Sequence, residues 1–302
     1  MTNILVIGSL NTDLVVRAPR FPAPGETIQG ENLITIPGGK GANQSVAAAR
    51  LGAQVTMIGR VGADTFGSTL IDNLQQNKVD THRIIRDDST ATGTAVIIVD
   101  SQGQNSIVLS PGANAKVTSS DIGPDSFLGS GLLLLQFEIP IETVIHSAHL
   151  AREKGLRVLL NPAPAYNIPD DLLRTADYIL PNETELGLLT GKPVSDLAMV
   201  EAAAYTLIAR GARNIIVTLG AEGALIVNNE FVKLIPAFKV KVVDTTAAGD
   251  AFIGGLAVGL LDGKSLQDAV QYACACGALA VTKFGAQPSL PTAEDVKIFI
   301  NR

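Results

Sequence analysis

The chain has 302 residues, of which 46% are hydrophobic and 17% are charged, so it can bury a sizeable core and is neither a disordered chain nor a coiled coil. Its 23 basic and 29 acidic side chains give a net charge of −6 without any basic block, which argues against nucleic acid as a partner. No apolar run is long enough to span a membrane, the N-terminus has no basic leader pattern, and there are only two cysteines. We therefore expect a cytoplasmic protein with no membrane contact.

Short, continuous apolar runs predict the strands of a parallel sheet that is covered on both faces. In chain order they are residues 4–7, 55–58, 132–135, 158–160, 178–180 and 215–218. Helical patterns alternate with them at residues 43–51, 66–76, 141–153, 183–189, 198–210, 250–261 and 266–283. This alternation predicts an α/β fold, a doubly wound three-layer sandwich, with residues 1–302 in a single domain.

Two pairs of short strand-like segments interrupt this pattern and are typical of hairpins. They are residues 14–18 with 32–36, and residues 94–100 with 106–110. We expect these segments to form a small β-sheet, inserted within residues 12–37 and 92–110. Its functional interpretation is a lid over a ligand, and the alternative is a plain extension of the main sheet at its edge.

The strongest chemical signal is the segment 244–250, Asp-Thr-Thr-Ala-Ala-Gly-Asp, which opens an apolar helix. Small residues ahead of a helix let backbone N–H groups approach an anion, and the helix dipole favours negative charge there. Asp250 in that first turn is suited to take the proton of a hydroxyl during phosphoryl transfer. Taken alone, an aspartate at this position is better explained as a helix cap.

Other polar residues follow the predicted strands. The segment 11–13 follows the first strand, Glu138 the third, and segments 182–185 and 218–223 the last two, while the glycine-rich turn 37–43 leads into a helix. The carboxyl ends of parallel strands meet at one edge of the sheet, where open α/β sheets bind ligands. One such placement is usually a cap or a turn, but several together predict a ligand site.

Two segments resemble the signatures of the PfkB sugar-kinase family: residues 38–45, with Gly52 and Gly62 after them, and residues 244–255. The resemblance covers essentially the whole chain. Segments 11–13, 39–43, 161–165 and 285–289 resemble the ribokinase branch of the family in particular. The resemblance implies a ribokinase-like fold and ATP-dependent phosphorylation of D-ribose at its 5-hydroxyl, giving D-ribose 5-phosphate and ADP.

The resemblance also implies roles for individual residues. Asp250 would be the base, and the N–H groups of Ala247, Ala248 and Gly249 would form an anion hole for the transferred phosphoryl group. Besides Asp250, the positions that match the family's sugar-binding residues are Asn11, Thr12, Asp13, Gly39, Lys40, Gly41, Ala42, Asn43 and Glu138. Those that match its ATP-binding residues are Asn182, Thr218, Leu219, Gly220, Ala221, Glu222, Gly223, Gly249 and Cys274.

Metal ions and a partner are implied in the same way. Glu185 would lie near Mg²⁺ and contact it through water. The positions that match an activating K⁺ site are Asp244, Thr246, Ala280, Lys283, Gly285 and Ser289. Relatives carry other residues at Thr246 and Cys274. The lid strands are expected to pair two copies of the chain as a homodimer.

Two alternatives stay open. The chain could be a family member that phosphorylates another small sugar or a nucleoside, such as deoxyribose, fructose or adenosine. Asn11, Asp13 and Lys40 favour a free pentose, because a nucleoside kinase needs an apolar slot for the base. The chain could also be a non-catalytic sugar-binding regulator, which the intact Asp250 argues against.

Overall fold

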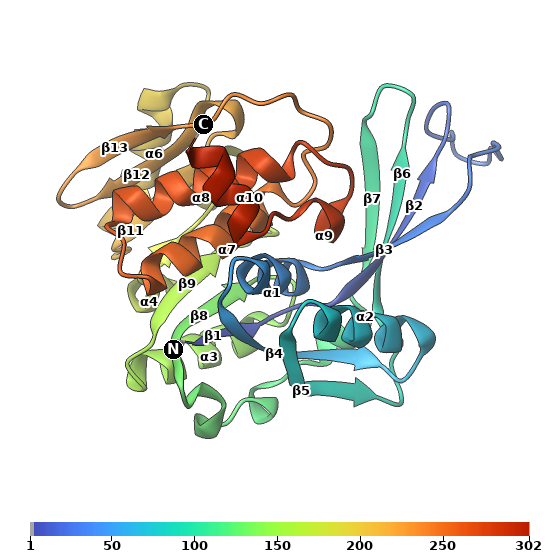
Figure 1. Cartoon of the computed structure of the whole chain (residues 1–302), viewed down its shortest axis with the longest axis horizontal. Coiled ribbons are helices and arrows are strands. Elements are labelled where there is room, and N and C mark those ends of the chain that lie inside the picture. Colours follow the sequence, from blue (N-terminus) through green and yellow to red (C-terminus); the bar gives the residue numbers. More distant parts are fainter. Residues whose placement is uncertain (1–2, 302) are drawn as a thin grey trace.

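The structure, a computed structural model, describes residues 3–301, which form a nine-stranded and a four-stranded β-sheet (Figure 1). The larger sheet has the order β13-β12-β11-β10-β9-β8-β1-β4-β5. Its strands from β5 to β11 are parallel, and β12 and β13 extend one edge in antiparallel orientation. The strands are β1 (Asn3–Ile7), β4 (Gln54–Gly62), β5 (Val79–Asp87), β8 (Ser130–Gln136), β9 (Arg157–Asn161), β10 (Tyr178–Ile179), β11 (Asn214–Thr218), β12 (Gly223–Asn228) and β13 (Val232–Pro236).

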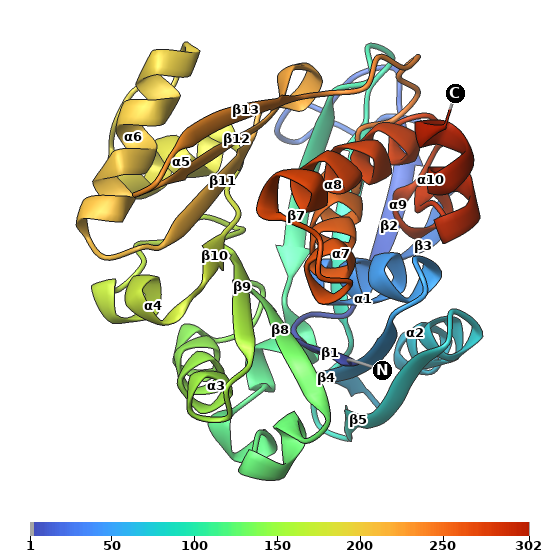
Figure 2. The same ribbon diagram turned by 60° about the vertical axis from the view of Figure 1, so that its left-hand side comes forward.

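Helices cover both faces of this sheet (Figure 2). One face packs against α1 (Lys40–Arg50), α2 (Thr65–Gln76), α7 (Ala248–Leu261), α8 (Leu266–Ala280) and α10 (Ala293–Ile300). The other packs against α3 (Ile141–Glu153), α4 (Asp170–Thr175), α5 (Glu183–Thr190) and α6 (Leu197–Ala209). Because successive strand residues point to opposite faces, Ile4 and Val6 of β1 enter one core and Leu5 and Ile7 the other. The predicted three-layer α/β sandwich is confirmed.

The smaller sheet, which we call the lid sheet, has the order β3-β2-β6-β7 and stands off the main body (Figure 1). Its strands are β2 (Asn11–Arg17), β3 (Ile34–Gly38), β6 (Gly93–Val99) and β7 (Asn105–Ser110). The prediction of a separate small sheet is confirmed, and an edge extension of the main sheet is not what forms. β2 begins three residues earlier than predicted, so segment 11–13 lies in the lid sheet itself.

Large apolar side chains of the lid sheet and the loop beside it lie in solvent in the single chain. These exposed side chains are Leu33, Ile34, Val96, Ile107, Val108 and Leu109. Val108 is the most exposed of them, at 67%. Val15 and Ile36, in contrast, are buried. The lid sheet therefore presents apolar surface that no other part of the described chain covers.

Some elements differ from the sequence prediction. The helix predicted at 266–283 ends at Ala280, because the carbonyl of Val281 accepts hydrogen bonds from the N–H groups of Val243 and Asp244 at 2.8 and 3.2 Å. The strands β5, β12 and β13 and the helices α4, α9 (Ala286–Ser289) and α10 were not predicted. β5 and β13 carry many polar or exposed residues, and α4 and α9 are too short to show a period. Within residues 3–301, no helix is both long and apolar enough to cross a lipid bilayer.

Candidate functional site

The first turns of α1 and α7 lie side by side where the lid sheet joins the main body (Figure 1). The two helices pack closely because Gly254 of α7 has no side chain. A Cβ at Gly254 would come within 2.6 Å of the Cβ of Ala47 in α1. This packing puts Asp250, in the first turn of α7, next to Asn43 in the first turn of α1.

Asp250 is 8% exposed, and both of its carboxylate oxygens accept hydrogen bonds from α1. Asn43 Nδ2 donates to Oδ2 at 2.9 Å, and Gln44 Nε2 donates to Oδ1 at 3.0 Å. The first residue outside the helix, Ala247, receives no side-chain cap and has a left-handed φ of 59°. The carboxylate of Asp250 is therefore held by a neighbouring helix, which removes the helix-cap alternative.

Five ionisable groups meet around this point, and their charges affect the pKa of Asp250, Asp13 and Lys40. Burial raises the pKa of Asp250, and the positive charge of Lys40 opposes that rise. Burial also raises the pKa of Asp13 to about 7, helped by the negative charges of Glu138 and Asp250. For Lys40, burial alone would lower the pKa, but the attraction of Asp250, Glu138 and Glu185 raises it. Lys40 thus stays protonated among the carboxylates.

Glu138 and Asn11, two further residues predicted to bind sugar, are held in place by hydrogen bonds. Glu138 Oε2 accepts hydrogen bonds from Ser9 Oγ at 2.5 Å and from the Lys40 N–H at 3.0 Å. Asn11 Oδ1 accepts a bond of 2.7 Å from Asn114 Nδ2, which leaves the Asn11 amide nitrogen as the donor. These contacts fix the side chains of Glu138 and Asn11 at the junction of the two sheets.

A glycine turn brings α1 against the start of the lid sheet. Gly39 has a φ of 89°, and a Cβ there would lie 2.7 Å from the Asn11 nitrogen. A Cβ at Gly38 would collide with the carboxylate of Asp13. Gly39, Asn11 and Asp13 therefore belong to one surface.

The other three predicted sugar-binding positions, Thr12, Gly41 and Ala42, contribute no side chain to this surface. The N–H of Gly41 donates to Ser9 Oγ at 3.3 Å. Ala42 is buried in the hydrophobic core, and Thr12 is also buried, 3% exposed.

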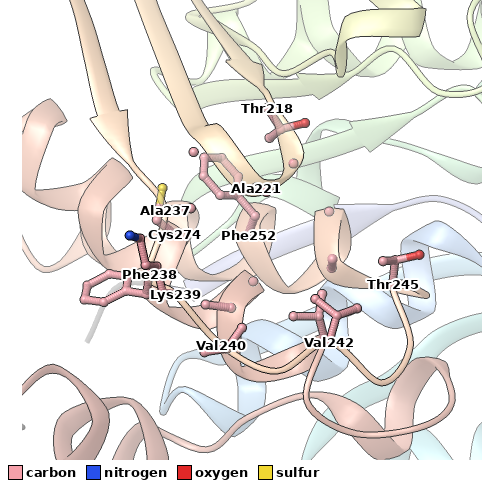
Figure 3. Close-up of a pocket in the computed structure, with 17 residues that line it drawn as sticks. Thr218, Ala221, Ala237, Phe238, Lys239, Val240, Val242, Thr245, Phe252 and Cys274 are labelled. Atoms are coloured by element: carbon pink, nitrogen blue, oxygen red, sulfur yellow. The ribbon is translucent and has the colours of Figure 1, made fainter.

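Two cavities adjoin beside Asp250, at Thr218 and Gly249. The smaller, about 180 Å³, is polar and lies between α1, α5 and α7. The larger, about 470 Å³, is mainly apolar and lies between β12, the segment after β13, α7 and α8 (Figure 3). Thr218 and Gly249 line both cavities, so the two are adjoining parts of one site. The polar cavity is lined by Lys40, Asn161, Leu180, Asn182, Glu185, Thr218, Ala247, Gly249, Asp250 and Ile253.

Most residues predicted to bind ATP line these cavities. Those in the apolar cavity are Thr218, Gly220, Ala221, Gly223, Gly249 and Cys274, whereas Asn182 lines the polar one. Leu219 instead packs in the core, and Glu222 is exposed and lines neither cavity. Burial raises the pKa of the Cys274 thiol to about 12, so Cys274 offers an uncharged, unreactive wall.

The predicted anion hole lies at the joint between the two cavities. Ala247 and Gly249 line the polar cavity, and Ala248 and Gly249 line the apolar one. The N–H of Ala248 donates to the Thr245 carbonyl at 3.3 Å, so in this arrangement it closes a turn.

Glu185 lines the polar cavity from the first turn of α5. It forms a reciprocal cap with Asn182: Glu185 Oε2 accepts the Asn182 N–H at 2.9 Å, and Asn182 Oδ1 accepts the Glu185 N–H at 2.8 Å. Burial raises the pKa of Glu185. Among residues 3–301, no group of three or more His, Cys, Asp and Glu side chains is arranged to hold a metal ion.

The residues predicted to bind K⁺ come from two segments that pack against each other. Asp244 Oδ1 accepts bonds from the N–H and the hydroxyl of Thr246 at 2.9 and 2.7 Å, and Oδ2 accepts the Gly285 N–H at 2.9 Å. Although burial opposes it, these bonds lower the pKa of Asp244. Ala280 ends α8, Lys283 is exposed, and the hydroxyl of Ser289 donates to the Ala286 carbonyl. Asp244, Thr246 and Gly285 thus form one connected group, and hydrogen bonds do not join Ala280, Lys283 and Ser289 to it.

A further cavity of about 610 Å³ lies beside Glu138, on the side away from the ATP-binding positions. Its walls are largely apolar and include Leu109 at the end of β7, and Phe137 and Tyr166, whose rings lie 6.2 Å apart. An apolar slot here was not predicted from the sequence, because its residues come from three separate segments, 109–115, 137–141 and 164–167.

Several site residues were missed for similar reasons. The apolar cavity is also lined by segment 237–242, which carries neither a motif nor a period, and by Phe252 and Val281, which lie in predicted helices but had been given no role. Ser9 and Asn114 contact predicted site residues and Gln136 contacts Gln44, yet each is a single polar residue outside the quoted motifs. Gln44 stands inside the predicted signature 38–45 but had been given no role. Polar residues at strand ends and the segments 37–43 and 244–250 ahead of two helices were the signals that pointed to this region.

Comparison with known proteins supports the resemblance seen in the sequence. A model of the pfkB family of carbohydrate kinases matches residues 1–293. A ribokinase of Haemophilus influenzae is 41% identical over 299 residues, which cover 98% of this chain and 98% of that protein. A deoxyribokinase of Salmonella typhimurium is 38% identical, with 99% of both chains covered. The structure of Arabidopsis thaliana ribokinase complexed with ribose and ATP matches with a TM-score of 0.93, at 33% sequence identity and with 100% of both chains covered.

Proposed function

The chain belongs to the pfkB family of carbohydrate kinases, and on this basis we propose that it transfers the γ-phosphoryl group of ATP to the 5-hydroxyl of D-ribose. The products would be D-ribose 5-phosphate and ADP. The observation that carries this proposal is the position of Asp250, a buried carboxylate beside Gly249, where a polar and an apolar cavity adjoin. A base there can reach a phosphate chain in the polar cavity, and through Asn43 it borders the space between α1 and the lid sheet where the sugar would lie.

In the proposed reaction, the 5-oxygen of ribose attacks the γ-phosphorus and passes its proton to Asp250. The bond between that phosphorus and the bridging oxygen of ADP breaks, so that ADP leaves with the bonding electrons. Lys40 and the N–H groups of Ala247, Ala248 and Gly249 offset the negative charge of the transferred group. For this, the N–H of Ala248 would leave its 3.3 Å contact with Thr245.

The sugar would lie between the lid sheet and α1, against Asn11, Asp13, Gly39, Asn43 and Glu138. Asn43 supports this placement because its side-chain oxygen is buried and has no hydrogen-bond partner in the described chain. A buried acceptor without a donor is costly, and a sugar hydroxyl would satisfy it. A closed lid sheet would exclude water, which otherwise competes as the phosphoryl acceptor.

ATP would place its adenine in the apolar cavity, beside Cys274 and Phe252, and its phosphates in the polar one. Mg²⁺ would be held by the phosphates and, through water, by Glu185, whose Oε1 is not engaged in the cap with Asn182. One carboxylate suits this ion, which keeps much of its water shell and bridges phosphate oxygens in kinases. When bound there, Mg²⁺ would neutralise part of the phosphate charge.

K⁺ would lie beside Asp244, Thr246 and Gly285, with carbonyls and hydroxyls of Ala280, Lys283 and Ser289 completing the site. The lowered pKa of Asp244 supports this, since the group is anionic. The role of K⁺ would be structural, because it would stiffen the loop that carries Ala247. We further propose that the protein works in the cytoplasm, as a homodimer joined through the lid sheets.

A specific observation favours each of two other substrates. The deoxyribokinase relative matches along the whole chain, so 2-deoxy-D-ribose is the second candidate. The 610 Å³ apolar cavity beside Glu138 could take the base of a nucleoside, which makes adenosine the third.

The test is the rate of ADP release with D-ribose, 2-deoxy-D-ribose, D-fructose and adenosine, with the product identified by mass spectrometry and phosphorus NMR. We expect kcat/KM to be highest for D-ribose and the phosphate to be on O5. A higher kcat/KM for another acceptor would overturn the substrate, and no ADP release with any of them would favour the non-catalytic regulator.

A further inference from the structure

Behind Asp250 lies a row of three buried side-chain amides, Gln44, Gln136 and Asn161, which we call the amide row. Gln44 Nε2 donates to Asp250 Oδ1 at 3.0 Å and to Asn161 Oδ1 at 3.2 Å. Gln136 Nε2 donates to Gln44 Oε1 at 2.6 Å. Gln44 and Gln136 are both 0% exposed, and Asn161 is 6% exposed. The amide row therefore connects the ends of β8 and β9 to the predicted base.

The orientation of each amide follows from the chemistry of its partners. Asn161 Nδ2 donates to the Leu180 carbonyl at 3.0 Å, and a carbonyl can only accept. Asn161 must therefore turn its oxygen towards Gln44, so that Gln44 donates both of its amide hydrogens, one of them to Asp250. Gln44 then shows its oxygen to Gln136, and Gln136 must donate in turn.

This arrangement leaves one atom of Gln136, the last member of the amide row, without a hydrogen-bond partner in the described part of the chain. This atom, Oε1, is buried. It packs against Gly8, whose own N–H donates to the Ile58 carbonyl, and a Cβ at Gly8 would collide with it. A buried acceptor without a donor destabilises a fold, and an apolar side chain here would remove this acceptor but leave Gln44 Oε1 without the donor it has. The distinct contribution of Gln136 is thus the donor that it presents to Gln44.

We propose that Gln136 is a positioning residue, which orients Gln44 so that an N–H always faces Asp250 Oδ1 and the carboxylate stays ionised and directed at the sugar hydroxyl. This inference rests on the proposed function, in which Asp250 is the base. Without the bond from Gln136, only Asn161 and Asp250 would orient the Gln44 amide, so its N–H would be held less firmly against Asp250 Oδ1.

The charged groups around Asp250 set the direction of the expected effect. Lys40 faces it from α1, Asp13 from the lid sheet, Glu138 from the end of β8 and Glu185 from α5. The hydrogen bond from Gln44 lowers the pKa of Asp250, against the rise that burial causes. Weakening that bond therefore raises the pKa of the base, and more of it is protonated at a given pH.

The test compares two variants of Gln136 in the full-length protein. Gln136→Met fills similar space but cannot donate, whereas a buried Gln136→Glu keeps a proton at moderate pH and can donate it to Gln44. For Gln136→Met we expect kcat with D-ribose to fall about tenfold, which corresponds to one hydrogen bond. The acid limb of the kcat–pH profile should move to higher pH, and KM for both substrates should stay within about threefold. Gln136→Glu should retain clearly more kcat than the methionine variant.

Thr143→Val is the matched control, because Thr143 is equally buried and its hydroxyl donates to the Val117 carbonyl at 2.9 Å, away from the site. We expect Thr143→Val to melt at a lower temperature than the parent and to show the same kcat–pH profile. An unchanged profile in Gln136→Met, or equal kcat in the Met and Glu variants, would overturn the positioning role. That result, together with loss of turnover in Asp250→Asn, would leave the proposed function intact. High turnover in Asp250→Asn would instead show that Asp250 is not the base.

Discussion

Asn43 Nδ2 donates a hydrogen bond of 2.9 Å to Asp250 Oδ2, although 207 positions separate the two residues in the chain. The pair joins the two segments that resemble family signatures, one in the first turn of α1 and one in the first turn of α7. A carboxylate held in this way has its orientation set before any substrate arrives, which is what a general base requires.

Replacing Asp250 with Asn should abolish most turnover without preventing binding. The amide keeps the size of the carboxylate but cannot take a proton, so we expect kcat to fall by about 10²–10⁴ or more. Calorimetric titration should still detect D-ribose and ATP. Asp262→Asn, at the exposed C-terminal end of the same helix, is the control and should keep parental turnover. Near-parental kcat in Asp250→Asn would show that another group is the base.

Asp13 should make the protein less stable as the pH rises through about 7. Its pKa in the folded protein is raised to about 7, from the 3.8 of a free group, so the folded state holds a proton that the unfolded state has lost. The stability that this proton contributes is complete below pH 3.8 and disappears as the pH passes 7. Asp13→Asn is neutral at every pH, so its melting temperature minus that of the parent should increase between pH 5 and 8. Thermal melts across this range measure the difference; a constant difference would contradict the raised pKa.

Activity should depend on a monovalent cation separately from Mg²⁺. At fixed Mg²⁺, we expect K⁺ to activate more than Na⁺, because loops lined with carbonyl oxygens suit a large, weakly hydrated ion. Asp244→Asn should lose most of this stimulation, since it removes the negative charge beside the site. Initial rates in KCl, NaCl and choline chloride of equal ionic strength test this. Equal rates in all three salts for the parent would remove K⁺ from the proposal.

The lid sheet should join two copies of the chain. Large, exposed apolar side chains on β-strands favour association, and a second lid sheet is the simplest cover. Light scattering at micromolar concentration should give twice the 31.4 kDa of one chain. Val108→Glu, and charged substitutions at Val16 or Ile34, should reduce this mass and raise KM for the sugar, with little change in nucleotide binding.

Leu188→Glu is the control for the lid variants, because Leu188 is 70% exposed on α5, outside the lid sheet. It should leave the mass unchanged. A parental mass near 31.4 kDa would contradict the homodimer.

The α/β sandwich and the general location of the site could be predicted from the sequence, because both depend on local patterns. Runs such as residues 132–135 are apolar on both faces, and only a covered parallel strand needs that. Glu138 follows this strand directly, so its place at the carboxyl edge follows from chain order.

The contacts inside the site could not be predicted in the same way. Gln44 and Gln136 are 92 residues apart, and nothing in either segment indicates which amide donates. The apolar wall of the larger cavity includes Phe252 from α7 and Val242 from an irregular segment, which meet only after the helices pack. Edge strands such as β13 alternate too weakly to be distinguished from a loop.

The close approach of Gly254 to Ala47 has a mechanical consequence. Because the crossing of α1 and α7 lies deep in the core, the interval between Lys40 and Asp250 is determined by interior packing and not by the loops that precede them. The lid sheet has no such anchor along most of its length. Motion during a catalytic cycle should therefore be confined to the lid sheet, while the distance between Lys40 and Asp250 stays constant. A methyl group at position 254, which lines neither of the two cavities, would push α1 and α7 apart and so change the chemistry without touching a substrate.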